Sequence, residues 1–197
     1  MEQPSSGKVC VRGTDIYRDL TFDQRAVFRS KKYGIVHQQA NWIKSLNVIE
    51  NVIFPLAVMG KSERASYTRA DEMLRLFRLE EFEKNTPTEL SGGQQQRVSV
   101  VRSLITNPWI VVADEPTGNL DTAAAADLMY IFQFLNADSK RTIIMVTHNP
   151  DYDKYATRII KMEDGKIIST KVKKRVSVNE DEVKGDILTG TKEGARI

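Results

Sequence analysis

Two apolar runs that each end in polar residues constrain the fold of this chain more than any other feature. The first run, 109–113 (WIVVA), is followed by Asp114 and Glu115, and the second, 142–146 (TIIMV), is followed by a threonine and then by His148. Unbroken apolar runs of this length are typical of strands buried on both faces of a parallel sheet. The carboxyl ends of parallel strands share one edge, where open α/β sheets bind ligands. We therefore predict that the two carboxylates and the imidazole lie together at such an edge.

The residues before the first run predict an anion-binding helix. Residues 91–93 (SGG) open a pattern in which Val98, Val101 and Ile105 recur at helical spacing, and the Asn-Pro pair at 107–108 ends it. Serine is a favoured N-cap, and two glycines leave backbone N–H groups exposed at the positive end of the helix dipole. A phosphate-binding helix start beside an Mg²⁺-type aspartate, a glutamate and a histidine indicates hydrolysis of a nucleoside triphosphate.

Three segments in this order resemble motifs of the ATP-binding cassette (ABC) ATPases: LSGGQ at 90–94, VVADEPTGNLD at 111–121 and IIMVTH at 143–148. The resemblance covers roughly the first 170 residues. It identifies LSGGQ as the signature motif, the start of the second segment as the Walker B motif, its end as the D-loop, and His148 as the switch histidine. The sequence PTGNLD, with the glutamines at 38–39, is most similar to the corresponding motifs of the lipoprotein-releasing and macrolide-export branch. The partner of that branch is a separate or fused permease.

The resemblance implies a role for each residue at the predicted sheet edge. Asp114 would hold Mg²⁺ through water, and Glu115 would orient and deprotonate the attacking water. His148 would sense the γ-phosphate of ATP, and Gln38 would complete the Mg²⁺ shell. ATP and Mg²⁺ are therefore the expected cofactors, with Glu115 and His148 as the catalytic residues.

The resemblance also implies a dimer. The signature motif would clamp the γ-phosphate of ATP bound to the opposite subunit, so two ATPase domains must pair head to tail. Asp121 in the D-loop would contact the partner across that interface. The residues expected to bind nucleotide are Gln38, Leu90, Ser91, Gly92, Gly93, Gln94 and Asp121.

Simpler interpretations stay open for several of these residues. Asp121 could act only as the N-cap of the next helix, and both roles are compatible. Gln38 could be a loop amide that caps backbone groups, and Gln39 a solvated loop residue. Asp114 and Glu115 could be surface acids, and His148 a loop histidine. His37 falls inside a predicted strand, 33–37, and is interpreted as structural.

The expected fold is an α/β, P-loop NTPase-like ABC cassette with a mostly parallel sheet core and an inserted helical subdomain. We expect an ABC ATPase domain over 1–170, with the helical subdomain at about 41–105, and a polar C-terminal tail over 171–197. Residues 8–12 read as a strand, and Thr21 begins a short helix. The acidic-glycine turn at 163–165 predicts a hairpin.

Three further helices are predicted from apolar spacing. The first two would form the helical subdomain, with faces made by Val48, Val52 and Leu56 and by Ala70, Met73, Leu74 and Phe77. The third, 122–136, would bury Ala125, Leu128, Met129, Phe132 and Leu135. The stretch 47–59 resembles the region where a permease's coupling helix docks. Whether Phe54 and Leu56 contact such a partner or the core is left open.

A phosphate loop of the form GxxxxGK[ST], which a working ABC ATPase needs, is not found. The pair Gly7-Lys8 fails the pattern, because Glu2 stands at the first glycine position and Val9 at the hydroxyl position. We expect that the chain begins just downstream of this loop, without the first strands and the P-loop helix. We also expect an exposed sheet edge and core surface, weak ATP binding and little activity from this chain alone.

Composition limits the other possibilities. A net charge of +3 and a pI near 8.9 are too mild to indicate nucleic-acid binding. The single cysteine, Cys10, excludes an internal disulfide and is interpreted as a half-buried strand residue. Residues 1–7 show no secretory signal pattern, and the apolar segment 48–59 is too short to span a bilayer. We expect a cytoplasmic protein held at the inner face of the membrane by a permease.

The leading hypothesis is an ATPase subunit that drives a permease for export or extraction of a substrate. A non-transport ABC protein acting on DNA or ribosomes is a second hypothesis, but such proteins carry long coiled coils or two cassettes, which this sequence lacks. A third is a non-catalytic cassette that serves only as the partner of an intact ATPase. The transported substrate is not encoded in these motifs.

Overall fold

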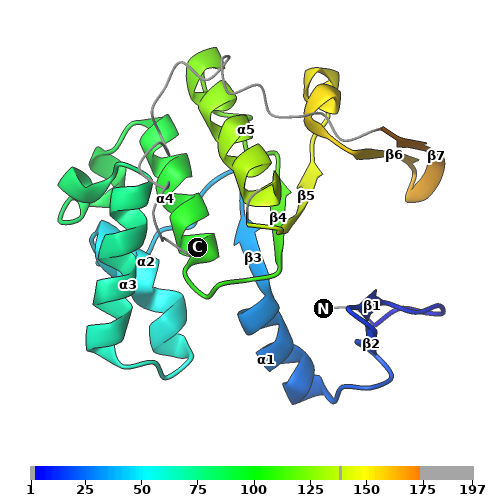
Figure 1. The fold of residues 1–197 in the computed structure, drawn as a ribbon, viewed down its shortest axis with the longest axis horizontal. Helices are drawn as coiled ribbons and strands as arrows, with labels where there is room; N and C mark the ends of the chain where they lie inside the picture. Colours follow the sequence, from blue (N-terminus) through cyan, green and yellow to red (C-terminus); the bar gives the residue numbers. More distant parts are fainter. Residues whose placement is uncertain (1–2, 138, 174–197) are drawn as a thin grey trace.

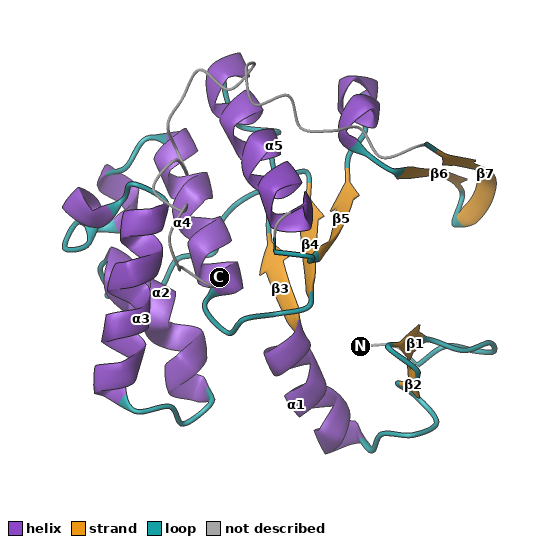
Figure 2. Ribbon diagram, viewed as in Figure 1, coloured by secondary structure: helices purple, strands orange, loops and turns teal. Residues whose placement is uncertain are grey.

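A three-stranded parallel sheet lies at the centre of the computed structural model, which describes residues 3–137 and 139–173. Its strands are β3 (Tyr33–Val36), β4 (Ile110–Asp114) and β5 (Thr142–Val146), in the order β3-β4-β5 (Figure 2). Asp114 at the end of β4 pairs with Val146 at the end of β5. The predicted parallel pair of apolar strands is therefore confirmed, with its carboxyl ends in register.

Two helices cover one face of this sheet: α4 (Gly92–Leu104) packs on β3 and α5 (Thr122–Ala137) packs on β5 (Figure 1). The side chains of Val36, Val111 and Ala113 point into this layer and are fully buried. The predicted inner face of α5 is buried as expected. Helix α4 approaches β3 so closely that a Cβ added to Gly34 would lie 2.3 Å from the carbonyl oxygen of Ser103.

The opposite face of the sheet is open to solvent. Ile35 on β3 is 48% exposed and Ile144 on β5 is 47% exposed, and Val112 between them is only partly buried. The prediction that both runs are buried on both faces is therefore wrong for this face, because no described element packs over it. Apolar side chains are thus exposed on this face of the sheet.

Between β3 and α4 the chain is helical. It forms α2 (Val48–Val58), α3 (Glu63–Leu76) and the 3₁₀ turns η1 (Glu80–Phe82) and η2 (Pro87–Glu89). Both predicted apolar faces, on α2 and α3, are buried in the core that they share with α4. Helix α2 begins with a capping box in which Asn47 and Glu50 bond each other's backbone N–H. Helical elements thus occupy the predicted region, while the division into domains stays a prediction.

A short hairpin and a helix precede the sheet. The hairpin pairs β1 (Cys10–Val11) with β2 (Thr14–Asp15) and lies at the periphery of the fold (Figure 1). Helix α1 (Phe22–Lys32) starts at Thr21, as predicted, with a capping box. The strand predicted over 8–12 is shorter than expected. Cys10 is exposed rather than half-buried, because among the described residues β1 pairs only with β2 and is not part of the central sheet.

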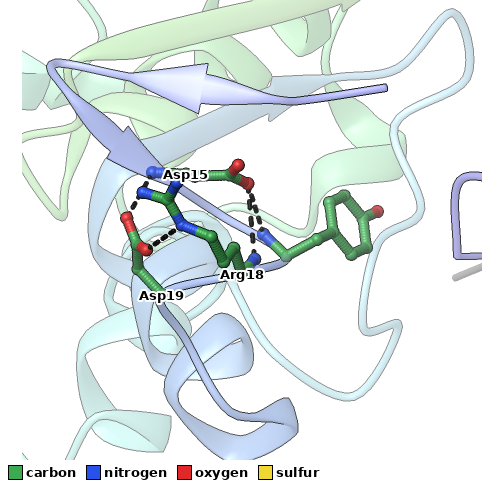
Figure 3. Close-up of polar contacts among 4 residues, drawn as sticks. Asp15, Arg18 and Asp19 are labelled. Atoms are coloured by element: carbon green, nitrogen blue, oxygen red, sulfur yellow. Dashed lines mark hydrogen bonds and ion pairs between the residues drawn. The ribbon is translucent and has the colours of Figure 1, made fainter. Parts of the chain in front are cut away.

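The turn between β2 and α1 is held by its own carboxylates (Figure 3). Asp15 accepts hydrogen bonds from the backbone N–H groups of Tyr17 and Arg18 at 3.2 and 3.3 Å. Asp19 accepts from the Asp15 N–H at 2.9 Å and from Arg18 Nε at 2.8 Å. This arrangement needs no ligand to account for it, so we assign it to turn formation.

After β5, the 3₁₀ turn η3 (Pro150–Tyr155) leads into the hairpin of β6 (Arg158–Glu163) and β7 (Lys166–Val172). The hairpin predicted from 163–165 is found, and Asp164 and Gly165 both have positive φ, as a tight two-residue loop requires. Strand β7 runs two residues into the predicted polar tail 171–197, and 174–197 lie outside the described residues. Within the described part of the chain, no helix is long and apolar enough to cross a bilayer.

Candidate functional site

Glu115 and His148 meet at the carboxyl edge of the sheet. The backbone N–H of His148 donates to Glu115 Oε1 at 2.8 Å, and Nδ1 of the same histidine lies 2.8 Å from that oxygen. The hydroxyl of Thr147 donates to Glu115 Oε2 at 3.2 Å. An ionised carboxylate only accepts hydrogen bonds, so Nδ1 carries the imidazole proton here. The predicted convergence of the acid and the imidazole is confirmed.

These contacts fix the charge of Glu115. Burial of the carboxylate raises its pKa, but hydrogen bonds from the ring and backbone of His148 and from Thr147 outweigh burial, so the pKa of Glu115 lies below its ordinary value. The carboxylate is therefore ionised at neutral pH. His148, with a side chain 89% exposed, remains accessible to a ligand.

The backbone of Glu115 is strained. Its φ is +41°, in the left-handed region that non-glycine residues rarely occupy. The conformation is held by its N–H, which donates to the Val146 carbonyl at 2.9 Å, and by its carbonyl, which accepts from Gly118 N–H at 3.1 Å. Strain of this kind costs about 1–3 kcal/mol and is concentrated at functional sites.

Asp114 and Gln38 are the residues predicted to bind Mg²⁺. Asp114 ends β4 with an exposed side chain, and no hydrogen bond to its carboxylate is found among the described residues. Gln38 packs on the loop that follows Glu115, since a Cβ on Gly118 would lie 2.8 Å from Gln38 Nε2. No described cluster of three or more acidic, histidine or cysteine residues could hold a metal alone. One carboxylate and one amide suit an Mg²⁺ ion whose other ligands are phosphates and waters.

The start of α4 forms as predicted. Ser91 is the N-cap: its Oγ accepts from the Gln94 N–H at 3.3 Å, while Gln94 Oε1 accepts from the Ser91 N–H at 2.8 Å. Gly92 and Gly93 follow as the first two helical residues, whose N–H groups have no acceptor within the helix. The side chain of Leu90 is buried in the core, so any contact from Leu90 to a nucleotide is limited to its backbone.

A hollow of about 300 Å³ joins this helix start to the loop 119–121 and the start of α5. Gly93 is needed there, because a Cβ on it would lie 2.9 Å from the Cβ of Ala124. Asp121 Oδ1 accepts from the Ala124 N–H at 2.8 Å, which confirms its N-cap role. Its contact across a dimer interface stays a prediction.

A second hollow, of about 270 Å³, lies between the loop after β3 and the start of α4. Gln38 and Gln39 line one side, and Gln95 and Gln96 line the other. His37 lies after β3 rather than inside it and is exposed, which corrects the prediction. Its carbonyl accepts from Gln96 Nε2 at 3.2 Å.

Sequence reasoning missed several residues of this region. The role of Thr147 had a signal, because a hydroxyl that directly follows a strand and precedes the predicted histidine must lie at the same edge. Trp42 and Gln95 had none: their side chains bond each other across 53 residues of sequence.

Known proteins resemble this chain closely. Residues 1–118 match the family described as ABC transporter. The macrolide export ATP-binding/permease protein MacB of Syntrophobacter fumaroxidans is 43% identical over 169 residues, which is 85% of this chain and 24% of that protein. An uncharacterized ABC transporter ATP-binding protein of Methanocaldococcus jannaschii is 40% identical over 168 residues, 85% of this chain and 74% of that protein. The chain thus spans about a quarter of the macrolide export protein.

Solved structures agree with these matches. A dimeric ATP-binding cassette in a post-hydrolysis state, bound to ADP and Pi, superposes with a TM-score of 0.77 at 34% identity, over 89% of this chain and 77% of that one. The cbiO1 subunit of an ABC transporter complex from Clostridium perfringens gives a TM-score of 0.76 at 27% identity, over 86% and 67%.

The parallel sheet, the glycine-bearing helix start and the carboxylate held at the strand ends define an α/β domain of the P-loop NTPase-like cassette class. Within this class, the family is shown by the ABC transporter match over residues 1–118. It is also shown by the 40% identity to the Methanocaldococcus jannaschii ATP-binding protein, of which the chain covers 74%. The chain belongs to the ABC transporter ATP-binding family.

Proposed function

We propose that this chain is the ATP-binding and ATP-hydrolysing part of an ABC transporter and that it couples hydrolysis to export or extraction of a substrate by a permease. The observation that carries the proposal is the Glu115 carboxylate, kept ionised and oriented by His148 and Thr147 at the carboxyl edge of the sheet. A charged, oriented carboxylate at this edge is what a general base for water attack requires.

In this proposal Glu115 accepts a proton from the attacking water and orients that water by hydrogen bonding. His148 holds the carboxylate in place and, with its exposed ring, reaches the γ-phosphate. Asp114 and Gln38 would hold Mg²⁺, which when bound offsets the negative charge of the phosphates. Thr147 is the residue that the structure adds to this group.

The signature residues act in a head-to-tail dimer. Ser91, Gly92 and Gly93 would bind the γ-phosphate of a nucleotide held by a second cassette, with the N–H groups of Gly92 and Gly93 and the helix dipole as the source of affinity. In this arrangement the signature residues of one cassette would complete the nucleotide site of the other. A similar cassette is dimeric and bound to ADP and Pi, which supports the arrangement.

A permease is the proposed membrane partner, which would place the chain at the cytoplasmic face. The macrolide export relatives are named ATP-binding/permease proteins, which supports export. On α2, Leu56 is buried in the core, whereas Phe54 is 44% exposed and Val58 is more so. Phe54 and Val58 are therefore the α2 side chains that we propose meet the permease.

The test is phosphate release from ATP by the assembled transporter that contains this chain. Glu115→Gln removes the general base and keeps the shape of the side chain, so turnover should fall by roughly 10²–10⁴-fold while ATP binding persists. Glu163→Gln, on the exposed hairpin β6–β7, is the matched control and should leave turnover unchanged. A wild-type transporter that releases no phosphate contradicts the function, and a fully active Glu115→Gln variant contradicts the role of Glu115.

A further inference from the structure

Gln94, the last residue of the signature motif, is followed by Gln95 and Gln96. The side chains of these three glutamines form hydrogen bonds with different partners. Gln94 closes the capping box on Ser91. The side chains of Gln95 and Gln96 both bond the segment 37–42 that follows β3. Neither of them is used in the proposed chemistry.

Gln95 bonds two partners that are far apart in sequence. Its Nε2 donates to the carbonyl of Leu90 at 3.0 Å, directly before the signature serine. Its Oε1 accepts from the indole Nε1 of Trp42 at 3.0 Å. One amide therefore joins the loop before α4 to the loop after β3, and both of its polar atoms are used.

Trp42 is itself fixed in position. The guanidinium of Arg102, on α4, lies 4.5 Å from the centre of the indole ring, as a cation–π contact. Arg102 Nη1 also donates to the carbonyl of Asn41 at 3.0 Å. Trp42 thus has a defined orientation, so its indole N–H is aimed at Gln95 rather than free to rotate.

Gln96 secures the other end of the same segment. Its side chain is buried, and its Nε2 donates to the carbonyl of His37, the residue before Gln38. The segment 37–42 is therefore attached to α4 at both ends, with Gln38 between the two attachments. The second hollow lies between this segment and α4.

We propose that Gln95 is a positioning residue that, through Trp42 and the Leu90 carbonyl, holds the signature residues 91–93 at a fixed distance from Gln38. The importance of this link for turnover rests on the proposed function, because there Gln38 and Ser91 each act on the nucleotide. A displacement of the segment 37–42, for instance by a bound partner, is then transmitted to the Leu90 carbonyl, directly before the signature serine, through the Gln95 amide.

Three variants separate the two hydrogen bonds of Gln95. Gln95→Met keeps the length of the side chain and removes both bonds. Gln95→Glu keeps an acceptor for the Trp42 indole and removes the donor to the Leu90 carbonyl. Trp42→Phe keeps an aromatic ring over Arg102 and removes the indole N–H. Gln39→Met is the matched control: Gln39 lines the same hollow and is exposed, and its side chain forms no hydrogen bond with the described part of the chain.

Amide hydrogen exchange of the purified chain tests the link without nucleotide. The N–H groups of Gln94 and Gln95 are bonded to the Oγ and carbonyl of Ser91 and so report on the signature loop. Their exchange should become about fivefold faster in Gln95→Met and in Trp42→Phe, and should not change in Gln39→Met. In Gln95→Glu the exchange should rise while the emission maximum of Trp42 stays at its wild-type position.

A purely structural role would give a different result. If Gln95 only stabilised the fold, exchange in β4 would rise along with that of Gln94 and Gln95 in the Gln95→Met variant, and this result overturns the proposal. Unchanged exchange of Gln94 and Gln95 in Trp42→Phe overturns it as well, because the effect must cross from one loop to the other.

The assembled transporter supplies the second readout. Gln95→Met and Trp42→Phe should lower kcat by about tenfold with little change in KM for ATP, since the misplaced signature residues would stabilise the γ-phosphate less well while its bond is cleaved. Wild-type kcat in both variants, in a transporter that hydrolyses ATP, overturns the proposal. If the wild-type transporter does not hydrolyse ATP, the proposed function is contradicted instead. The hydrogen-exchange result then decides by itself whether Gln95 is a positioning residue.

Discussion

Glu115 combines three features: a left-handed backbone conformation, a carboxylate that accepts from three hydrogen-bond donors, and a lowered pKa. The strain and the hydrogen bonds have one cause. The chain must turn sharply at the end of β4, and the turn aims the carboxylate across to Thr147 and His148 at the end of β5. Removing the carboxylate therefore affects stability as well as chemistry.

The lowered pKa of Glu115 predicts a pH-dependent stability. Its ordinary value is 4.5 and the folded value is lower, so the folded state gains stability above pH 4.5 that is lost as the pH falls through the folded pKa. Urea unfolding of wild type and Glu115→Gln at neutral pH and at about pH 3 measures this gain. The stability difference between the two proteins should be larger at neutral pH and shrink in acid. A difference that stays constant between the two pH values would mean that the pKa is not shifted.

At the scale of elements, the close packing of α4 on β3 requires a residue without a side chain at position 34 of β3. Gly34 faces the carbonyl of Ser103 near the end of α4, and a Cβ there would approach that oxygen to 2.3 Å. Backbone atoms cannot rotate away as a flexible side chain can. The helix that carries the signature motif would have to shift as a whole.

Gly34→Ala should therefore destabilise the fold by about 1–3 kcal/mol, the usual cost of overpacking a core. Gly92→Ala is the control: its Cβ would meet its nearest neighbours at 3.5 and 4.0 Å, which is ordinary contact. Thermal unfolding of both variants provides the comparison. Equal melting temperatures for Gly34→Ala and wild type would show that α4 shifts without cost.

Apolar patterns explain which elements could be predicted. Strand β5 was predicted with its observed bounds from its unbroken apolar run. All five residues predicted for the inner face of α5 are buried, together with Ile131, because burial on one face of a helix leaves a repeating pattern. Cys10 and His37 were misplaced because alternation over a few residues does not show whether another layer covers the strand. The bond between Trp42 and Gln95 leaves no local pattern at all, since it depends on where the fold brings α4.

At the scale of the whole molecule, the sheet has one covered face and one open face. The open face carries the row Ile35, Val112 and Ile144 across the three strands, next to the site-bearing edge. Contiguous apolar surface in contact with water favours association. Apolar side chains also line the covered face, where α4 and α5 bury them. The two faces therefore differ in which elements pack on them and not in the kind of residue they carry.

The open face predicts self-association of the purified chain. Ile144→Thr keeps a β-branched residue in β5 and removes part of the apolar row, so association should weaken by several-fold with little loss of stability. Ile160→Thr, on β6 at a similar exposure, is the control and should associate like wild type. Sedimentation over a range of protein concentrations measures both. Wild type that stays monomeric at high concentration contradicts the prediction.

The 197 printed residues contain no GxxxxGK[ST] loop, which predicts weak binding of ATP by these residues alone. A phosphate loop contributes charge-assisted hydrogen bonds worth about 1.5–3 kcal/mol each, so the absence of four costs roughly 6–12 kcal/mol before non-additivity. A micromolar ligand has about 8 kcal/mol of binding free energy in total. Calorimetric titration of the purified 197-residue chain with ATP and Mg²⁺ should therefore show a Kd weaker than millimolar. Addition of an intact cassette should yield nucleotide-dependent association, and Ser91→Ala should weaken it because the capping box that shapes the signature loop is lost. Micromolar binding by the chain alone would show that its own residues cradle the phosphates.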